Sequence, residues 1–476
     1  MSDAVLPENA ATEVAEFEQP SAQVPDQSVV LSASRLGKLG YSLADQVFAV
    51  GGMFIVNIAL ARVRSKEEYG IFALSYSVFT FLSGLHNAAI LEAYTIYGSG
   101  RYHHRFAGYG RLLWRSNAWL LAGLSALLLV IWQFLRWLHP AFAWPALLGM
   151  ALTCGVLLTA SFVRRTFYMR RRPDLALRFS AAFFVSCMVL LALTIRADLL
   201  NGLSAFLIVA LAWGIAALFI VRERPGRIEA EDDTDFFLQE PDYWSEHWKY
   251  SCWVFVTALV FQFTTQAYFW VVAGFLSMRD VAELRAMYNL VLPVDQIFGA
   301  ITLLILPQMA LQFAAQEFGQ LRHLWRQCSL MFLGISSAFA LVVGLGSLPL
   351  LHVVYGGKFD SVSSLLRWYV LLPVVMGVGN AANAALKAIE KPQAVFYAYV
   401  TSGAATFAVG VPLVMYLGLR GAVYGMLLSA ASYAAVLGIS FHRFSQPRIA
   451  EVVPVHDAGE EQGRLVSVSA TGEAEQ

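Results

Sequence analysis

The stretch that divides this sequence is Arg222-Glu223-Arg224-Pro225-Gly226-Arg227, which continues into an acidic run from Glu229 to Asp235 and ends near Tyr250. Apolar blocks precede and follow it, and the two successions of blocks show the same pattern. Arg172-Pro173 lies 219 positions before Lys391-Pro392, and Leu113-Trp114-Arg115 lies 211 positions before Leu324-Trp325-Arg326. Because loop insertions account for the small change in offset, the chain reads as two tandem, related halves joined by this linker.

The composition is that of a polytopic membrane protein. Apolar residues make up 58% of the chain and charged residues 14%, with a mean hydropathy of +0.58; soluble domains have about 45–50% and ~25%. We expect an all-α fold of twelve transmembrane helices in two related six-helix lobes, because each apolar block suffices to cross a bilayer and none alternates like a barrel strand. The blocks are 38–62, 70–98, 110–137, 143–166, 175–196, 200–221, 248–276, 283–313, 323–351, 364–389, 393–417 and 420–443.

The polar segments set the expected boundaries and orientation. We expect disordered cytoplasmic tails at 1–35 and 445–476, lobes at 36–222 and 248–444, and a cytoplasmic linker at 223–247. With both termini inside, the inner segments hold 23 of the 33 Lys and Arg residues. This bias favours both termini in the cytoplasm of a bacterial inner membrane.

The sequence offers no motif for soluble enzyme chemistry. It has no P-loop, no G-x-S-x-G and no H-E-x-x-H, so we expect neither direct use of ATP nor an enzyme. The four cysteines are far apart in or beside apolar blocks, which is typical of small buried side chains rather than of disulfides or metal ligands. No cofactor or metal is therefore expected.

Polar residues inside apolar blocks are costly to bury and therefore informative. They gather on the first two blocks of each half and on the tenth block, as a cavity between two lobes would require. The Asn and Gln side chains could equally fasten helices together, whereas a carboxylate in the membrane needs a partner or a proton. The candidates for substrate binding or for coupling to H⁺ or Na⁺ are Asp45, Gln46, Asn57, His86, Asn87, Glu92, Gln262, Gln266, Asp295, Gln296, Asn380 and Asn383.

Asp295 has no Lys or Arg at helical spacing. Its partner could be His86 of the opposite lobe, in a contact that forms in one access state and breaks in the other, or it could be protonated and bonded to Gln262 or Gln266. No arginine is expected near the middle of any helix.

Arginines crowd the inner rim of the first half. They could be a topology signal in contact with anionic lipid, or a mouth that collects a phosphate-bearing headgroup, because the Arg fork matches phosphate oxygens. The candidate rim residues are Arg111, Arg115, Arg164, Arg165, Arg170, Arg171, Arg172 and Arg178.

The order of several short elements resembles a known family. They are Asp45-Gln46, Gly51-Gly52-Met53-Phe54 and Asn57 in the first block, the turn Ser65-Lys66-Glu67-Glu68-Tyr69-Gly70, and Tyr355-Gly356-Gly357-Lys358-Phe359 and Gly418-Leu419-Arg420-Gly421-Ala422 later on. Over residues 38–440 the chain resembles the Wzx-type lipid-linked oligosaccharide flippases, the polysaccharide-exporter branch of the multidrug/oligosaccharidyl-lipid/polysaccharide (MOP) superfamily.

The resemblance implies a two-lobe transporter with a cavity that opens to each side in turn. Its expected cargo is a glycan unit linked to undecaprenyl pyrophosphate. Its expected partners are this glycan, membrane lipids and the polysaccharide polymerase machinery, with no nucleic acid. A small-molecule or multidrug cation antiporter of the same superfamily is the first alternative. A membrane glycan polymerase or ligase is disfavoured, because it needs a large outer loop that this sequence lacks.

Overall fold

The computed structural model describes residues 33–100, 102, 105–138, 144–222 and 243–445. Most of the expected tails and of the expected linker lie outside these residues. Within them the secondary structure is helical throughout, without strands. Twelve of the described helical segments are long and apolar enough to cross a membrane, and they coincide with the twelve predicted blocks. The protein is a multi-pass membrane protein of the predicted fold class.

The N-terminal lobe consists of the first six spans. Its elements are α1 (Ala33–Val63), α2 (Lys66–His86), the π-helix η1 (Asn87–Leu91), α3 (Glu92–Ser99), α4 (Phe106–Leu138), α5 (Pro145–Met169), α6 (Pro173–Arg196) and α7 (Gly202–Arg222). The second span is thus one continuous rod, α2–η1–α3, with a π-helical segment inside it.

The C-terminal lobe consists of the other six. Its elements are α9 (Tyr243–Phe275), α10 (Met278–Ala314), α11 (Phe318–Leu345), α12 (Ser347–Tyr355), η4 (Asp360–Val362), α13 (Ser363–Tyr369), α14 (Leu372–Ala388), α15 (Pro392–Ala405), the π-helix η5 (Thr406–Gly410), α16 (Val411–Leu417) and α17 (Leu419–Phe444). Helix α9 begins at Tyr243, so residues 243–247, expected in the linker, are helical. The block expected at 323–351 is divided at Gly346 into α11 and α12.

The two related sequence pairs Arg172-Pro173 and Lys391-Pro392 also have the same backbone conformation. Arg171 and Glu390 both adopt positive φ, at 55° and 58°. The next residues, Arg172 and Lys391, have φ/ψ of −113°/65° and −115°/57°, and each precedes a proline in the first turn of a helix. Proline suits that position because its missing N–H is not needed there and its φ is already helical.

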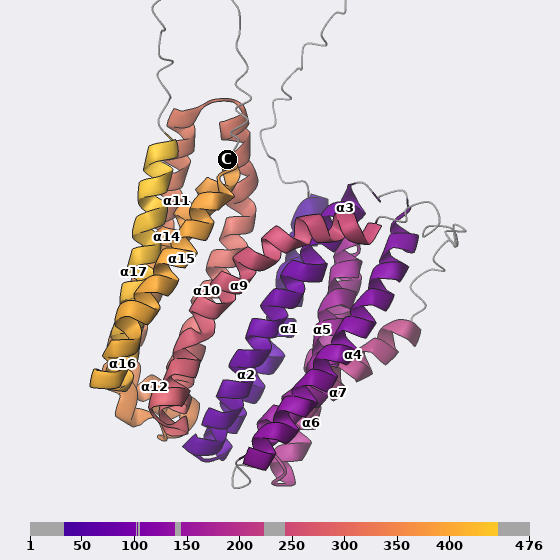
Figure 1. The fold of residues 1–476 in the computed structure, drawn as a ribbon, viewed down its shortest axis with the longest axis vertical. Coiled ribbons are helices and arrows are strands. Elements are labelled where there is room, and N and C mark those ends of the chain that lie inside the picture. Colours follow the sequence, from indigo (N-terminus) through magenta and orange to yellow (C-terminus); the bar gives the residue numbers. More distant parts are fainter. Residues whose placement is uncertain (1–32, 101, 103–104, 139–143, 223–242, 446–476) are drawn as a thin grey trace, which may run out of the picture.

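The two lobes meet at one end and separate toward the other (Figure 1). We call the upper end the one that holds the first residues of α1 and α9 and the last residues of α17. The lower end holds the α1–α2 turn at Ser65 and the α9–α10 turn at Ser277. The lobes diverge from the lower end toward the upper end (Figure 1).

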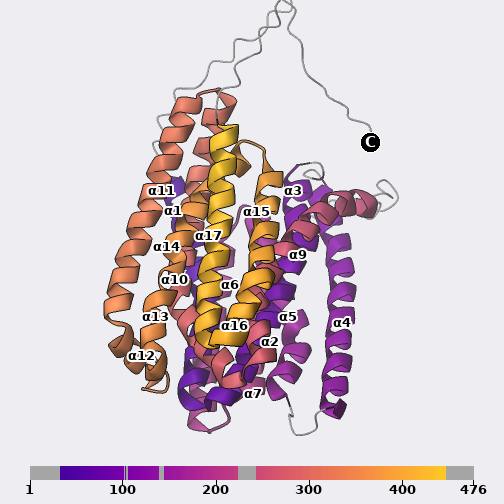
Figure 2. The same ribbon diagram turned by 60° about the vertical axis from the view of Figure 1, so that its left-hand side comes forward.

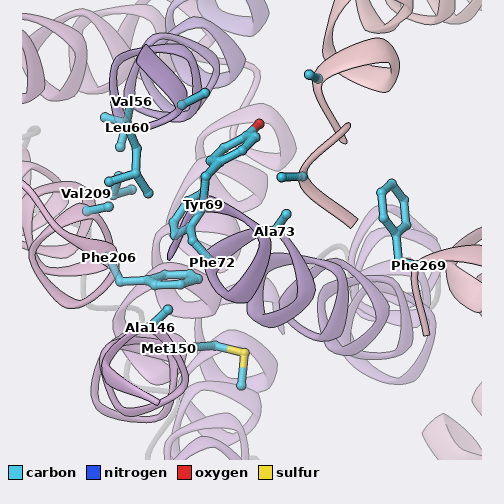
Figure 3. Close-up of a cluster of buried hydrophobic side chains, with 14 of the residues drawn as sticks. Val56, Leu60, Tyr69, Phe72, Ala73, Ala146, Met150, Phe206, Val209 and Phe269 are labelled. Carbon is cyan, nitrogen blue, oxygen red and sulfur yellow. The ribbon is translucent and has the colours of Figure 1, made fainter. Parts of the chain in front are cut away.

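The buried apolar side chains follow the same division. One core crosses between the lobes in the lower half; it combines Tyr69 and Phe72 of α2 with Phe206 of α7 and Phe269 of α9 (Figure 3). Two smaller cores lie higher up, around Phe298 and Phe332 in the C-terminal lobe and around the α3–α4 tyrosines in the N-terminal lobe. The lobes therefore share a large apolar core below. In the upper half the start of α9 packs into the α3–α4 core through Tyr243, and polar groups lie between the rest of the two lobes.

Candidate functional site

An ion pair joins the first and fourth spans on the interlobe side of the N-terminal lobe. Asp45 of α1 is fully buried. Its Oδ2 accepts hydrogen bonds from Arg164 Nη2 at 2.6 Å and from Tyr168 Oη at 2.6 Å, and its Oδ1 accepts from Arg164 Nε at 3.3 Å and from Ser180 Oγ. These four hydrogen bonds fix the position of the carboxylate and hold the Arg164 guanidinium in place. Both residues were predicted separately, Asp45 as a membrane carboxylate and Arg164 as part of the rim.

A second charged cluster faces the C-terminal lobe. Arg165 Nη2 donates to Asn87 Oδ1 at 3.1 Å, and Arg165 also lies within electrostatic range of Glu92. Glu92 accepts a hydrogen bond from Tyr250 of α9 and is within electrostatic range of Lys387 on α14. Two cations from opposite lobes thus lie within electrostatic range of one carboxylate, so basic side chains outnumber acidic ones in this cluster.

Lys387 was missed by sequence reasoning, because it stands in the last turn of α14 and reads there as an ordinary topology signal. Its position facing Glu92 depends on how the lobes are arranged.

One direct polar contact joins the lobes near mid-height. Gln46 Nε2 of α1 donates to Gln296 Oε1 of α10 at 3.4 Å, and Gln46 Oε1 accepts from Arg164 at 3.3 Å. Gln46 therefore connects the Asp45–Arg164 pair to the opposite lobe. The predicted residues Asp45, Gln46, Asn87, Glu92, Gln296, Arg164 and Arg165 are brought together into one interlobe site.

The first turns of α9 are bound to the N-terminal lobe. His247 is fully buried; its Nε2 is 2.9 Å from the carbonyl oxygen of Ala89, and its Nδ1 is 2.8 Å from Tyr109 Oη. Since only an N–H can donate to a carbonyl, Nε2 carries the proton and Nδ1 accepts from the tyrosine. Ala89 belongs to the π-helix η1, where the widened turn disturbs the regular hydrogen-bond ladder. Helix α9 thus contacts both lobes.

The lower end is sealed by contacts between the lobes. Asn289 of α10 donates to Asn57 Oδ1 at 3.3 Å and to Tyr69 Oη at 2.9 Å, and all three side chains are buried. Outside this triad, two ion pairs join the turns: Lys66–Glu283 at 2.5 Å and Arg279–Glu67 at 2.8 Å. Asn57, predicted as a substrate or coupling residue, lies in this seal, below the interlobe site.

Backbone contact tightens the same seal. A Cβ built on Gly70 would lie 1.8 Å from the carbonyl oxygen of Met278, so only glycine lets the starts of α2 and α10 approach this closely. Lys358 Nζ donates to the Arg64 carbonyl oxygen at 2.8 Å, and its partial burial lowers the pKa of Lys358.

Arg285 is a buried arginine of α10 that lies nearer to the lower end of this helix than to its middle. It stands two turns inside α10, 3% exposed, with its guanidinium 4.5 Å from the ring centre of Tyr76 and 4.9 Å from that of Tyr288. The rings offer cation–π stabilisation in place of a carboxylate. Arg285 lies in the block expected at 283–313 and was not among the predicted site residues.

Other predicted residues lie away from the interlobe site. His86 does not pair with Asp295: its Nε2 lies 2.7 Å from Asn117 Oδ1 of α4, inside its own lobe. Asn383 donates to Tyr433 at 2.9 Å within the C-terminal lobe. Gln262 packs against Gly84, and Gln266 is buried with an unbonded Oε1.

Asp295 is exposed on α10 beside Gln296. It makes no hydrogen bond or ion pair with any residue that the structure describes, and neither does Asn380.

The predicted rim is not one surface. Arg164 and Arg165 belong to the interlobe site, whereas Arg172 forms a two-pronged pair with Asp174 at 2.9 and 2.8 Å, which raises the pKa of Arg172. The remaining rim residues are exposed at the upper end: Arg111, Arg115, Arg170, Arg171 and Arg178. Across the described ranges, no group of three His, Cys, Asp or Glu side chains could hold a metal ion.

Solved structures of membrane proteins share this fold of two six-helix lobes. The chain is similar to an inward-facing multidrug resistance MATE family transporter of the MOP superfamily, with a TM-score of 0.72 and 13% identity over 85% of this chain and 98% of that one. It is similar to the lipid II flippase MurJ in an inward closed conformation, with a TM-score of 0.64 and 13% identity over 84% and 87% of the two chains. An outward-facing MATE family transporter gives a TM-score of 0.61 and 10% identity, over 86% and 95%.

A match to a family model shows the family of this chain. Residues 38–312 match the family described as polysaccharide biosynthesis protein, which is more than half of the chain. The chain belongs to this family. No curated protein sequence matches it significantly.

Proposed function

We propose that this protein is a Wzx-type flippase that moves a glycan linked to undecaprenyl pyrophosphate across the bacterial inner membrane by alternating access. The observation that carries the proposal is the distribution of contacts between the lobes. They are sealed at the lower end by the Asn57–Tyr69–Asn289 triad and two ion pairs, while charged groups of both lobes face each other in the upper half. Membership of the polysaccharide biosynthesis family supports a glycan as cargo.

The charge of the interlobe site suits a pyrophosphate. Arg165 and Lys387 both lie within electrostatic range of the Glu92 carboxylate and form no ion pair with it among the described residues, so an arriving diphosphate can bind both cations. Charge-assisted hydrogen bonds contribute about 1.5–3 kcal/mol each. Because Arg165 and Lys387 belong to opposite lobes, a bound diphosphate would draw the upper ends together, which is the direction needed for closure on that side.

The lysine and arginine distribution supports a cytoplasmic upper end, with both termini on that side. Single cysteines in a cysteine-free background test this. Cysteine at Ser65 or Ser361 should react with an impermeant thiol reagent in spheroplasts, whereas cysteine at Ala315 should react only after permeabilisation. The reverse pattern would invert the topology.

Transport is tested with purified protein in liposomes and a fluorescent lipid-linked oligosaccharide. Arg165→Gln and Lys387→Gln should each lower the translocation rate by about tenfold or more, the effect of one lost charge-assisted contact. Arg196→Gln makes the same change of charge at the exposed lower end of α6 and should transport normally. Wild-type rates in both site variants would remove the diphosphate role from this site.

The antiporter alternative has one observation in its favour, the exposed Asp295 carboxylate beside the interlobe site, which could bind a cation. The same liposomes loaded with a fluorescent cationic drug decide between the two. Drug movement driven by a pH gradient, without translocation of the lipid-linked glycan, would replace the flippase proposal.

A further inference from the structure

A groove on the N-terminal lobe lies apart from the interlobe site. It has a volume of about 300 Å³ and opens between α3, α4 and α5 near the upper end. Its walls are aromatic and its mouth is basic, with Tyr94, Phe106, Trp114 and Phe162 along the walls and Arg111 and Arg170 among the lining residues. The volume is at the lower limit of pockets that hold small molecules.

Helix periodicity separates this groove from the interlobe site. At 100° per residue, Phe162, Thr166 and Arg170 fall on one side of α5, whereas Arg164 and Tyr168 fall on the opposite side. The second side contacts Asp45 of α1, and the first lines the groove. α4, which forms the other wall, stands at the periphery of its lobe (Figure 2). The groove therefore faces the surrounding lipid.

The charge of the groove is of one sign. Its lining residues include two arginines and no carboxylate. Both guanidiniums are exposed, and neither forms an ion pair with the residues that the structure describes. Arg170 lies within electrostatic range of Tyr94, and the Tyr94 hydroxyl is 3.3 Å from Thr166 Oγ1. An anion between the arginines would thus find further hydrogen-bond donors behind them.

The groove is basic near the upper end and apolar further down, which matches the change from headgroup to acyl chain along a phospholipid. Arg111 stands in the second turn of α4, and Arg170 directly follows the end of α5, so both lie at the level of headgroups. Trp114 and Phe162 lie one to two turns deeper and pack edge to face, with ring centres 5.5 Å apart. Below them, α4 presents bare apolar side chains, with Trp119 79% exposed.

We propose that this groove is a binding site for one anionic phospholipid of the leaflet at the upper end. Its phosphate lies between Arg111 and Arg170, and the start of one acyl chain follows Trp114 and Phe162. Basic pockets between transmembrane helices bind anionic headgroups in this way, and arginine forks fit phosphate oxygens. The assignment does not depend on the transported substrate.

Native mass spectrometry of the purified protein tests it, with phosphatidylglycerol titrated against phosphatidylcholine in detergent. Wild type should retain one phosphatidylglycerol molecule. Arg111→Gln with Arg170→Gln should weaken its apparent affinity by about a hundredfold, since each charge-assisted contact accounts for about tenfold or more. Ala107→Trp keeps both charges but fills the groove, and it should lose the lipid as well.

The matched control is Arg322→Gln with Arg326→Gln. These exposed residues lie on α11, at the upper end of the other lobe, and this variant should keep wild-type affinity. Equal affinity for the two lipids, or equal loss in the control, would overturn the proposal. So would retention of phosphatidylglycerol by Ala107→Trp. Displacement of the phospholipid by equimolar lipid-linked oligosaccharide would replace it with a site for the glycan lipid.

Discussion

Gly70→Ala tests the seal at the lower end most directly. The added Cβ would lie 1.8 Å from the carbonyl oxygen of Met278 and 2.6 Å from its carbon. A carbon and an oxygen without a covalent bond approach to about 3.3 Å. The starts of α2 and α10 must therefore separate by about 1.5 Å, and no rotamer change can relieve the clash because both partners are main chain or Cβ.

The steric clash in Gly70→Ala destabilises only the conformation that is closed at the lower end. Overpacking in a close-packed interior costs about 1–3 kcal/mol, and this clash exists only while the lower ends of the lobes touch. A difference of that size between two states changes their ratio by about 5- to 150-fold. Gly70→Ala should therefore shift the protein toward a form that is open at the lower end.

Distances between spin labels measure the shift. Labels at Leu199→Cys and Ser364→Cys, one on each lobe near the lower end, are read in nanodiscs after replacement of the four native cysteines. The longer-distance population should grow in Gly70→Ala. Gly274→Ala is the control, because a Cβ there meets nothing within 4 Å. Identical distance distributions in wild type and Gly70→Ala would refute the reasoning.

Two further expectations concern carboxylates. Asp45→Asn leaves the Arg164 guanidinium, 19% exposed, without its carboxylate, and should destabilise the protein by about 3–5 kcal/mol. Thermal unfolding in detergent checks this, and Asp45→Asn with Arg164→Gln should recover part of the loss; simple additivity of the two single effects would contradict a direct pairing. Asp295→Asn should flatten the dependence of transport on external pH, because an exposed carboxylate without a protein partner is free to bind a proton. A normal rate with an unaltered pH profile would remove the coupling role.

The helices were predictable because bilayer crossing is a property of local composition. The twelve spans follow from the length of the apolar runs. The observed helix boundaries differ from the predicted ones where the conformation of one residue ends a helix, as at Gly346 between α11 and α12. The π-helix at 87–91 could not be foreseen. In this π-helix the carbonyl oxygen of Ala89 accepts a hydrogen bond from His247, which lies 158 positions further along the chain and in the other lobe. A local sequence pattern does not contain such a contact.

The site was predicted as a set of residue types but not as pairs. Asp45 and Arg164 were both selected because charge in a membrane helix needs a reason. Their contact depends on how α1 and α5 pack over 119 positions of sequence. The partner of His86 could not be predicted for the same reason. The direction in which its side chain leaves the helix determines whether it contacts Asn117 of its own lobe or a residue of the opposite lobe.

The seal between the lobes has the form of a symmetric dimer interface. Ser65 and Ser277, 212 positions apart, both cap the second helix of their lobe. At the same offset, Ser77 and Asn289 each bond to the first helix of the other lobe, through Trp270 and Asn57. In an isologous pair of identical six-helix units, every substitution would change such an interface twice.

Fusion into one chain removes that constraint. Arg285 illustrates the result, because the position 212 residues before it is occupied by Ala73. One copy carries a buried charge that the other lacks. The duplicated halves could thus keep a common architecture while only one of them acquired a given charge, which two identical subunits cannot do.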